Sequence, residues 1–151
     1  MSERFPDLPD HMRRLPVDKR GFPVPKFVAW VDGEPQFPIA TQEWLVKAHN
    51  QDLCYVCGGK LGRHRASVIG PMCAVNRTIS EPPSHTACAR FSAIHCPFLA
   101  NPRMKRVPVE KLQAKAPCGG HTEESILRNP GAVCVWIAPT KSKPWKTPAG
   151  N

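Results

Sequence analysis

The chain has 151 residues, a mass of 16.7 kDa and a formal net charge of +9 at pH 7. Its length predicts one compact domain, and its 18 prolines and 10 glycines predict short, often interrupted elements. No apolar run approaches the roughly 20 residues of a membrane-spanning helix, and the first residues show no secretory signal, so we expect a cytoplasmic protein without membrane contact.

Residues 1–25 contain five prolines, which predicts an extended arm lying on the domain rather than a helix. After the arm, the pair Asp32-Gly33 separates two apolar runs, a strong hairpin signal because both turn residues need a positive φ. We therefore expect residues 26–31 to pair with residues 34–39, whose two prolines place the second strand at an edge.

The centre of the chain predicts a helix, a second hairpin and a second helix. The first helix is expected to start at a Thr41 cap and to end near Asp52. Residues 66–79 contain two short apolar runs around Gly70-Pro71 and predict a hairpin. The second helix is expected to start at a Ser84 cap and to end at Pro97. Its predicted buried stripe comprises Ala87, Phe91, Ile94 and Phe98.

The carboxy-terminal third predicts short elements and a flexible end. We expect helices over residues 109–114 and 123–128 and a strand over residues 132–138. The domain organisation is then a core over 26–101, an extension over 102–138 that packs on it, and a mobile basic tail over 139–151.

Four side chains have the spacing of metal ligands. Seven cysteines in a chain without a secretory signal favour metal ligation over disulfides. Cys54 and Cys57 stand two residues apart and precede Gly58-Gly59, the pattern of a zinc-binding turn. His85 and Cys88 are separated by three positions at the start of the predicted second helix, so they project from one face. The four predict a closed structural Zn²⁺ site of the Cys₃His kind.

Other uses of the cysteines and histidines remain open. The four residues could instead be reduced buried cysteines and a helix-capping histidine. Cys96 could replace His85 only if the helix breaks, because eight helical residues rise about 12 Å. A second site could form from Cys118 and His121 with further ligands, although cysteines are often buried for packing alone. The candidate further ligands are Cys73, His95, Cys96 and Cys134.

The turn that carries Cys54 and Cys57, the expected hairpin and the ligand-bearing helix together resemble the treble-clef zinc fingers, a group that includes the HNH endonucleases. The wider sequence from Leu15 to Asn101 resembles small uncharacterised proteins of phages and bacteria. The resemblance implies an α+β fold and a bound zinc ion. It implies no catalytic residue, because the hairpin lacks the acidic residue beside a histidine that an HNH nuclease would use. The nearest equivalents are His64 and Asn76 in the hairpin and Glu81 after it.

The charge is unevenly distributed and indicates a partner. The residues before Cys54 are close to neutral, and the basic excess lies in the remainder of the chain. We expect a non-enzymatic module that contacts the backbone of nucleic acid through a basic face, with no small-molecule substrate. The predicted contact residues are Lys60, Arg63, Arg65, Arg77, Lys105 and Arg106.

Two alternative functions follow from other features of the sequence. A protein-interaction module, such as a phage protein that engages a host factor, is indicated by the segment Phe22 to Pro25 and by Trp136 and Trp145. The second alternative is an HNH-like, metal-dependent nuclease with His64 as its base.

Overall fold

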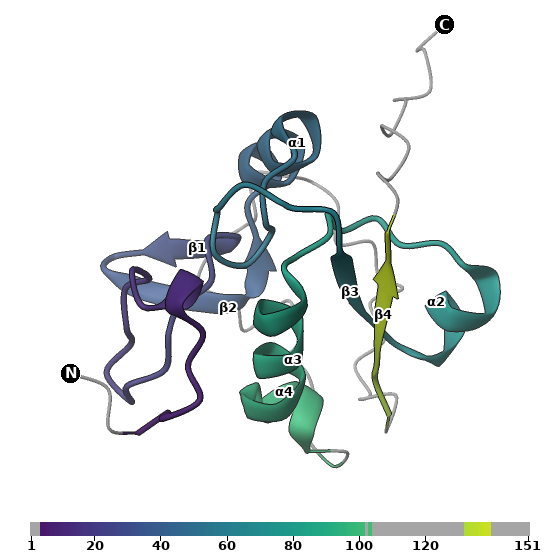
Figure 1. Cartoon of the computed structure of the whole chain (residues 1–151). Helices are drawn as coiled ribbons and strands as arrows, with labels where there is room; N and C mark the ends of the chain where they lie inside the picture. The colour runs from purple at the N-terminus through teal and green to yellow at the C-terminus, as the bar shows by residue number, and fades with distance from the viewer. Residues whose placement is uncertain (1–3, 102, 104–131, 140–151) are drawn as a thin grey trace, which may run out of the picture.

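The computed structural model describes residues 4–101, 103 and 132–139 (Figure 1). The fold of these residues is mixed α+β, as expected, and the described strands form two separate two-stranded antiparallel sheets. The elements in chain order are the 3-10 helix η1 (Asp10–Met12), β1 (Val28–Val31), β2 (Glu34–Ala40), α1 (Gln42–Gln51), β3 (Arg65–Ile69), α2 (Pro71–Asn76), α3 (Thr86–His95), α4 (Pro97–Ala100) and β4 (Cys134–Ala138).

The predicted first hairpin is confirmed. β1 and β2 pair with Val31 opposite Glu34, so Asp32 and Gly33 form the turn. Both turn residues have positive φ, 50° and 79°, as the Asp-Gly pair predicts. The register shifts between Val28 and Ala29, where the pairing is irregular.

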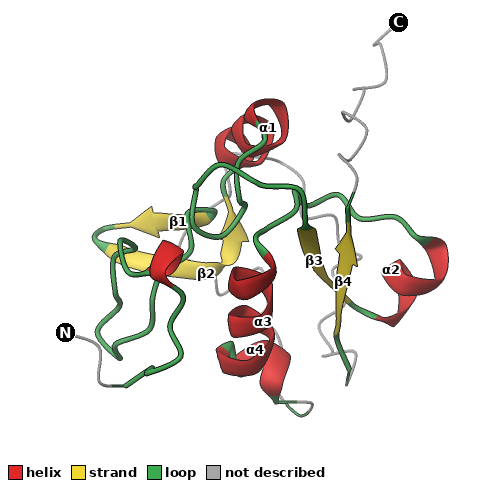
Figure 2. Cartoon of the chain, viewed as in Figure 1, coloured by secondary structure: helices red, strands yellow, loops and turns green. Residues whose placement is uncertain are grey.

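The predicted first helix is also confirmed. Thr41 occupies the N-cap of α1 in an extended conformation, although its side chain makes no capping hydrogen bond. The helix ends where Asp52 adopts a left-handed conformation with φ 59°. From there to the start of β3 the chain runs as a long loop, which carries the first two predicted metal ligands (Figure 2).

The predicted hairpin over residues 66–79 is wrong. Only its first half is a strand, because β3 pairs with β4, with Arg65 opposite Ala138 and Ile69 opposite Cys134. The second half forms α2, in which Pro71 takes the first helical position, where its fixed φ favours a helix and its missing N–H costs nothing. The expected strand over residues 132–138 is confirmed as β4.

The predicted second helix is confirmed as α3, but its cap and its buried face differ from the expectation. The N-cap is His85, while the backbone of Ser84 pairs with that of Ala66 at 2.7 and 2.8 Å. α3 ends before Pro97, as expected. The predicted stripe is right at Phe91, which is buried, and wrong at Ala87 and Ile94, which are exposed, while Phe98 is half-buried. The buried residues of α3 are Cys88, Ala89 and Phe91.

The amino-terminal segment supplies a large part of the core. Its buried side chains Phe5, Leu8, Met12 and Leu15 belong to one cluster with residues of the loop between α1 and β3 and of α3. The members from those two regions are Cys54, Val56, Leu61, Cys88 and Phe91. Since α3 also packs along β3 and β4, it joins this cluster to the second sheet (Figure 1).

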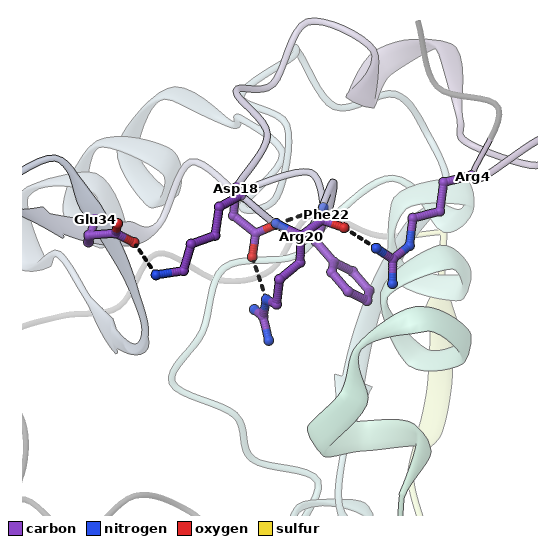
Figure 3. Close-up of polar contacts among 6 residues, drawn as sticks. Arg4, Asp18, Arg20, Phe22 and Glu34 are labelled. Atoms are coloured by element: carbon purple, nitrogen blue, oxygen red, sulfur yellow. Dashed lines mark hydrogen bonds and ion pairs between the residues drawn. The ribbon is translucent and has the colours of Figure 1, made fainter.

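Polar contacts hold the chain after η1 in a compact loop (Figure 3). The Asp18 carboxylate accepts hydrogen bonds from the backbone N–H groups of Arg20 and Phe22 and from the Arg20 guanidinium. Arg4 donates to the backbone oxygen of Arg20, and Lys19 pairs with Glu34 of β2 at 3.5 Å. These contacts tie the segment to itself and to the first hairpin.

Several predictions fall on residues that the structure does not describe. They are the helices over 109–114 and 123–128, the tail over 139–151 (except Pro139), Lys105, Arg106, Cys118, His121 and Trp145. Within the described ranges, no helix combines the length and apolar character needed to cross a membrane.

Candidate metal centre

The structure brings the four predicted ligands together. The Sγ atoms of Cys54, Cys57 and Cys88 and a ring nitrogen of His85 all lie within 4.8 Å of one another. Cys54 and Cys88 are fully buried, and the other two are half-buried. These four side chains could hold a metal ion, and no other such group of three or more occurs among the described residues.

The turn over residues 54–59, which we call the knuckle, positions the first two sulfurs. Gly58 adopts a positive φ of 79°, and the chain closes with hydrogen bonds from Cys54 N–H to the Gly59 oxygen at 2.7 Å and from Gly58 N–H to the Cys54 oxygen at 2.9 Å. The amide of Cys57 points at Cys54 Sγ at 3.5 Å, and that of Gly59 points at Cys57 Sγ at 3.4 Å. Such amides stabilise negatively charged sulfur.

The other two predicted ligands come from the start of α3. Cys88 lies in the first turn, where the positive end of the helix dipole favours a thiolate. His85 precedes the helix as its N-cap, and its own N–H points at Cys54 Sγ at 3.4 Å. The pairing of Ser84 with Ala66 fixes the chain just before this residue.

The hydrogen bonds of His85 assign its two ring nitrogens. Nε2 lies 2.9 Å from the backbone oxygen of Lys60, and a carbonyl oxygen only accepts, so Nε2 carries the proton. With the proton on Nε2, the neutral form of the imidazole has its unprotonated nitrogen at Nδ1, which faces the sulfurs, and this is the form that binds a metal. A metal-binding histidine commonly donates its second N–H to such a carbonyl.

The separations within the group suit a tetrahedral ion. With bonds of about 2.3 Å to sulfur and 2.0–2.1 Å to nitrogen, tetrahedral zinc places nitrogen and sulfur about 3.6 Å apart. His85 Nδ1 lies 3.3 Å from Cys57 Sγ and 3.8 Å from Cys88 Sγ. The donor set and its spacing thus fit Zn²⁺.

Ionisation of one of the three cysteine thiols disfavours ionisation of the other two. Hydrogen bonds from the thiols of Cys57 and Cys88 lower the pKa of Cys54 far below its usual range. The same contacts with Cys54 raise the pKa of Cys57 and of Cys88. A divalent cation at the centre would remove this competition, because it favours the thiolate form of every cysteine that it binds.

Three of the predicted nucleic-acid contacts lie together just after the knuckle. Lys60, Arg63 and Arg65 line one surface depression with Asp52 and Pro139. Lys60 and Arg63 are exposed, and Lys60 donates to the Gln51 oxygen at 2.8 Å. Arg77 is exposed at the end of α2, away from this loop in sequence.

Arg65 does not fit its predicted role. Its side chain is only 6% exposed and binds the Asp52 carboxylate with two guanidinium nitrogens. This contact raises the pKa of Arg65. A buried guanidinium that is already paired is not available to phosphate, so Arg65 holds β3 to the end of α1 instead.

The residues predicted for the two alternative functions differ in exposure and in position from what those functions need. His64 is exposed in the loop before β3, and Asn76 ends α2, so they are not neighbours in a hairpin as an HNH arrangement would need. The segment over residues 22–25 is not an exposed contact element, since Val24 is only 1% exposed. Trp136, by contrast, is exposed on β4.

One residue of the centre had no signal in the sequence. The ring of His11, in η1, stacks on the ring of His85 with centroids 4.3 Å apart and planes 13° from parallel. His11 stands alone in a proline-rich segment, without the spacing that marks a ligand pair.

Comparison of the chain with protein-family models, with curated proteins and with solved structures found no match.

Proposed function

We propose that the chain is a zinc-stabilised, non-enzymatic module that contacts nucleic-acid backbones through the loop over residues 60–63. The observation that carries the proposal is the hydrogen bond between His85 Nε2 and the Lys60 oxygen. It joins the metal centre to the first residue of the basic loop.

The metal is proposed to be Zn²⁺ with a structural role. Three sulfurs and one imidazole are a common structural zinc donor set, and four protein ligands leave no position for substrate or water. Bound zinc would cross-link the knuckle to α3 and would not take part in a reaction. The knuckle and the ligand-bearing helix support a treble-clef type of centre, with β3 and α2 in place of the expected hairpin.

The proposed phosphate contacts are Lys60 and Arg63, with Arg77 as a separate exposed cation. Lys60 and Arg63 are exposed and line the depression formed just after the knuckle in the chain. Two hydrogen bonds fix the loop. Leu61 N–H donates to the Asp52 oxygen at 3.0 Å, and His85 Nε2 binds the Lys60 carbonyl oxygen. Cations held on a rigid loop suit contact with phosphate, which carries no sequence information.

Salt dependence of binding tests this proposal. Affinity of the zinc-loaded chain for a duplex and for a single-stranded oligonucleotide is measured from 50 to 300 mM salt. The slope of log affinity against log salt is negative, and each lost phosphate contact reduces its magnitude by about 0.9 for duplex. We expect Lys60→Gln with Arg63→Gln to reduce the magnitude of the slope by about 2.

Lys19→Gln is the matched control, because Lys19 is exposed but already paired with Glu34. It should leave the slope nearly unchanged. Salt-independent affinity of the unaltered chain for both nucleic acids would refute the proposal. An equal loss of slope in the control and in the double variant would refute the assignment to this loop.

A protein-interaction module is the second candidate function, and exposed apolar side chains favour it. Met72 and Val75 of α2 and Trp136 and Ile137 of β4 are all exposed. Retention of a protein partner from a nuclease-treated lysate, lost on Met72→Ser with Val75→Ser, would support this function. Loss of every partner after nuclease treatment would favour nucleic acid.

A further inference from the structure

The imidazole of His85 is enclosed by three different parts of the chain. Its Nδ1 atom faces Cys57 and Cys88, and its Nε2 atom binds the Lys60 oxygen. At its edge, a Cβ added to Gly59 would come within 3.2 Å of Cε1, so the knuckle backbone approaches the ring closely. The ring of His11 lies against one face.

His11 is held over that face by a well-packed segment. Met12, the next residue, is only 2% exposed and belongs to the cluster that contains Cys54 and Cys88. Farther toward the amino terminus, Phe5 packs edge-on against Phe91 of α3 with centroids 5.5 Å apart. The His11 side chain is itself exposed, but its buried neighbour Met12 fixes the backbone from which the ring stacks on His85.

We propose that His11 is a positioning residue of the metal centre, which covers His85 and slows release of the metal. The inference rests on the proposed zinc site. Release from a closed four-ligand centre has to begin with one ligand leaving the ion. Cys54 and Cys88 are buried, so the half-buried His85 is one of the two ligands with room to leave, and a stacked ring restricts its rotation.

The direct test is the rate of zinc transfer from the loaded chain to an excess of a chromogenic chelator. Changes in residues that orient a metal ligand commonly cost about 10- to 100-fold in metal affinity. Because His11 makes a stacking contact rather than a hydrogen bond to the ligand, we expect His11→Ala to release zinc about tenfold faster. His11→Phe keeps a flat ring and should release zinc at nearly the original rate.

Arg14→Ala is the matched control, because Arg14 is exposed on the same segment and should leave the rate unchanged. The absorption bands of the Co²⁺-loaded chain give a second readout, since they report the geometry of the ligands. We expect His11→Ala to shift these bands and His11→Phe to restore them.

The outcomes separate this inference from the metal site itself. An unaltered chain that binds no zinc would refute both. Zinc binding with equal release rates for the unaltered chain and His11→Ala would refute only the role of His11. Release from His11→Phe as fast as from His11→Ala would show that stacking is not the cause.

Discussion

The backbone oxygen of Lys60 lies 2.9 Å from Nε2 of His85. A candidate metal ligand and a candidate phosphate contact therefore share one hydrogen bond, although 25 positions separate them in the chain. The bond fixes the tautomer of His85 and, at the same time, the start of the basic loop. Loss of the metal is expected to loosen both.

Cys57→Ser should remove the metal and destabilise the fold. A serine hydroxyl is a poor substitute for a zinc-bound thiolate, and about 10 kcal/mol or more of folding free energy comes from the metal in structural zinc sites. Thermal unfolding and zinc content measure the effect. Cys134→Ser is the control, because Cys134 is exposed on β4. Unchanged zinc content and unfolding temperature in Cys57→Ser would contradict the site.

Asp52→Asn should destabilise the fold by about 3 kcal/mol, because it leaves the buried guanidinium of Arg65 without a charged partner. Urea unfolding of the zinc-loaded chain gives the free energy. Asp10→Asn is the matched change at an exposed ion pair with Arg13 and should cost less than about 1 kcal/mol. Equal, small effects at both positions would mean that Arg65 is not buried as described.

Met12→Ala should cost about 2–5 kcal/mol, the usual range for truncating a large side chain in a packed core. Val17→Ala, at an exposed position of the same segment, should have little effect. Urea unfolding compares the two. If both changes are nearly neutral, the amino-terminal segment lies loosely on the surface and is not part of the core.

Asp18 should make the stability of the chain sensitive to acid. Burial alone would raise its pKa, but hydrogen bonds from the Phe22 and Arg20 amides and the Arg20 guanidinium outweigh burial and lower it. The contribution of Asp18 is thus fully present above the pKa of an unfolded aspartate, about 3.9. It disappears as the pH falls through the lower pKa of the folded state.

Unfolding free energies of the unaltered chain and of Asp18→Asn, measured from pH 7 to pH 3, test this dependence. Subtracting one unfolding free energy from the other at each pH cancels effects common to both proteins, such as acid release of the metal. We expect a constant difference down to about pH 4 and a smaller one below it. A difference that grows as the pH falls would contradict the assigned direction.

Local sequence signals predicted the local structure well. The Asp32-Gly33 turn, the two ends of α1 and the carboxy-terminal end of α3 depend on residues within a few positions, and each formed where expected. The meeting of the two ligand pairs was also predictable, because each pair carries its own spacing and a structural metal requires both.

Long-range features were not predictable in the same way. β3 pairs with a strand more than 60 positions later, and a Gly-Pro pair suits both a turn and the first position of a helix, so the residues near Ile69 did not decide between the two. Arg65 has the sequence context of an exposed cation, and only the left-handed end of α1 brings Asp52 to it. The contact of His11 with His85 likewise depends on the packing of the amino-terminal segment.

Elemental analysis of the chain, purified under reducing conditions and desalted, is the most direct test of the proposed zinc centre. We expect one zinc per chain, removed only by acid or a strong chelator, with a large fall in unfolding temperature on removal. A folded chain that contains no zinc, takes none up, and unfolds at the same temperature with or without added zinc would contradict it.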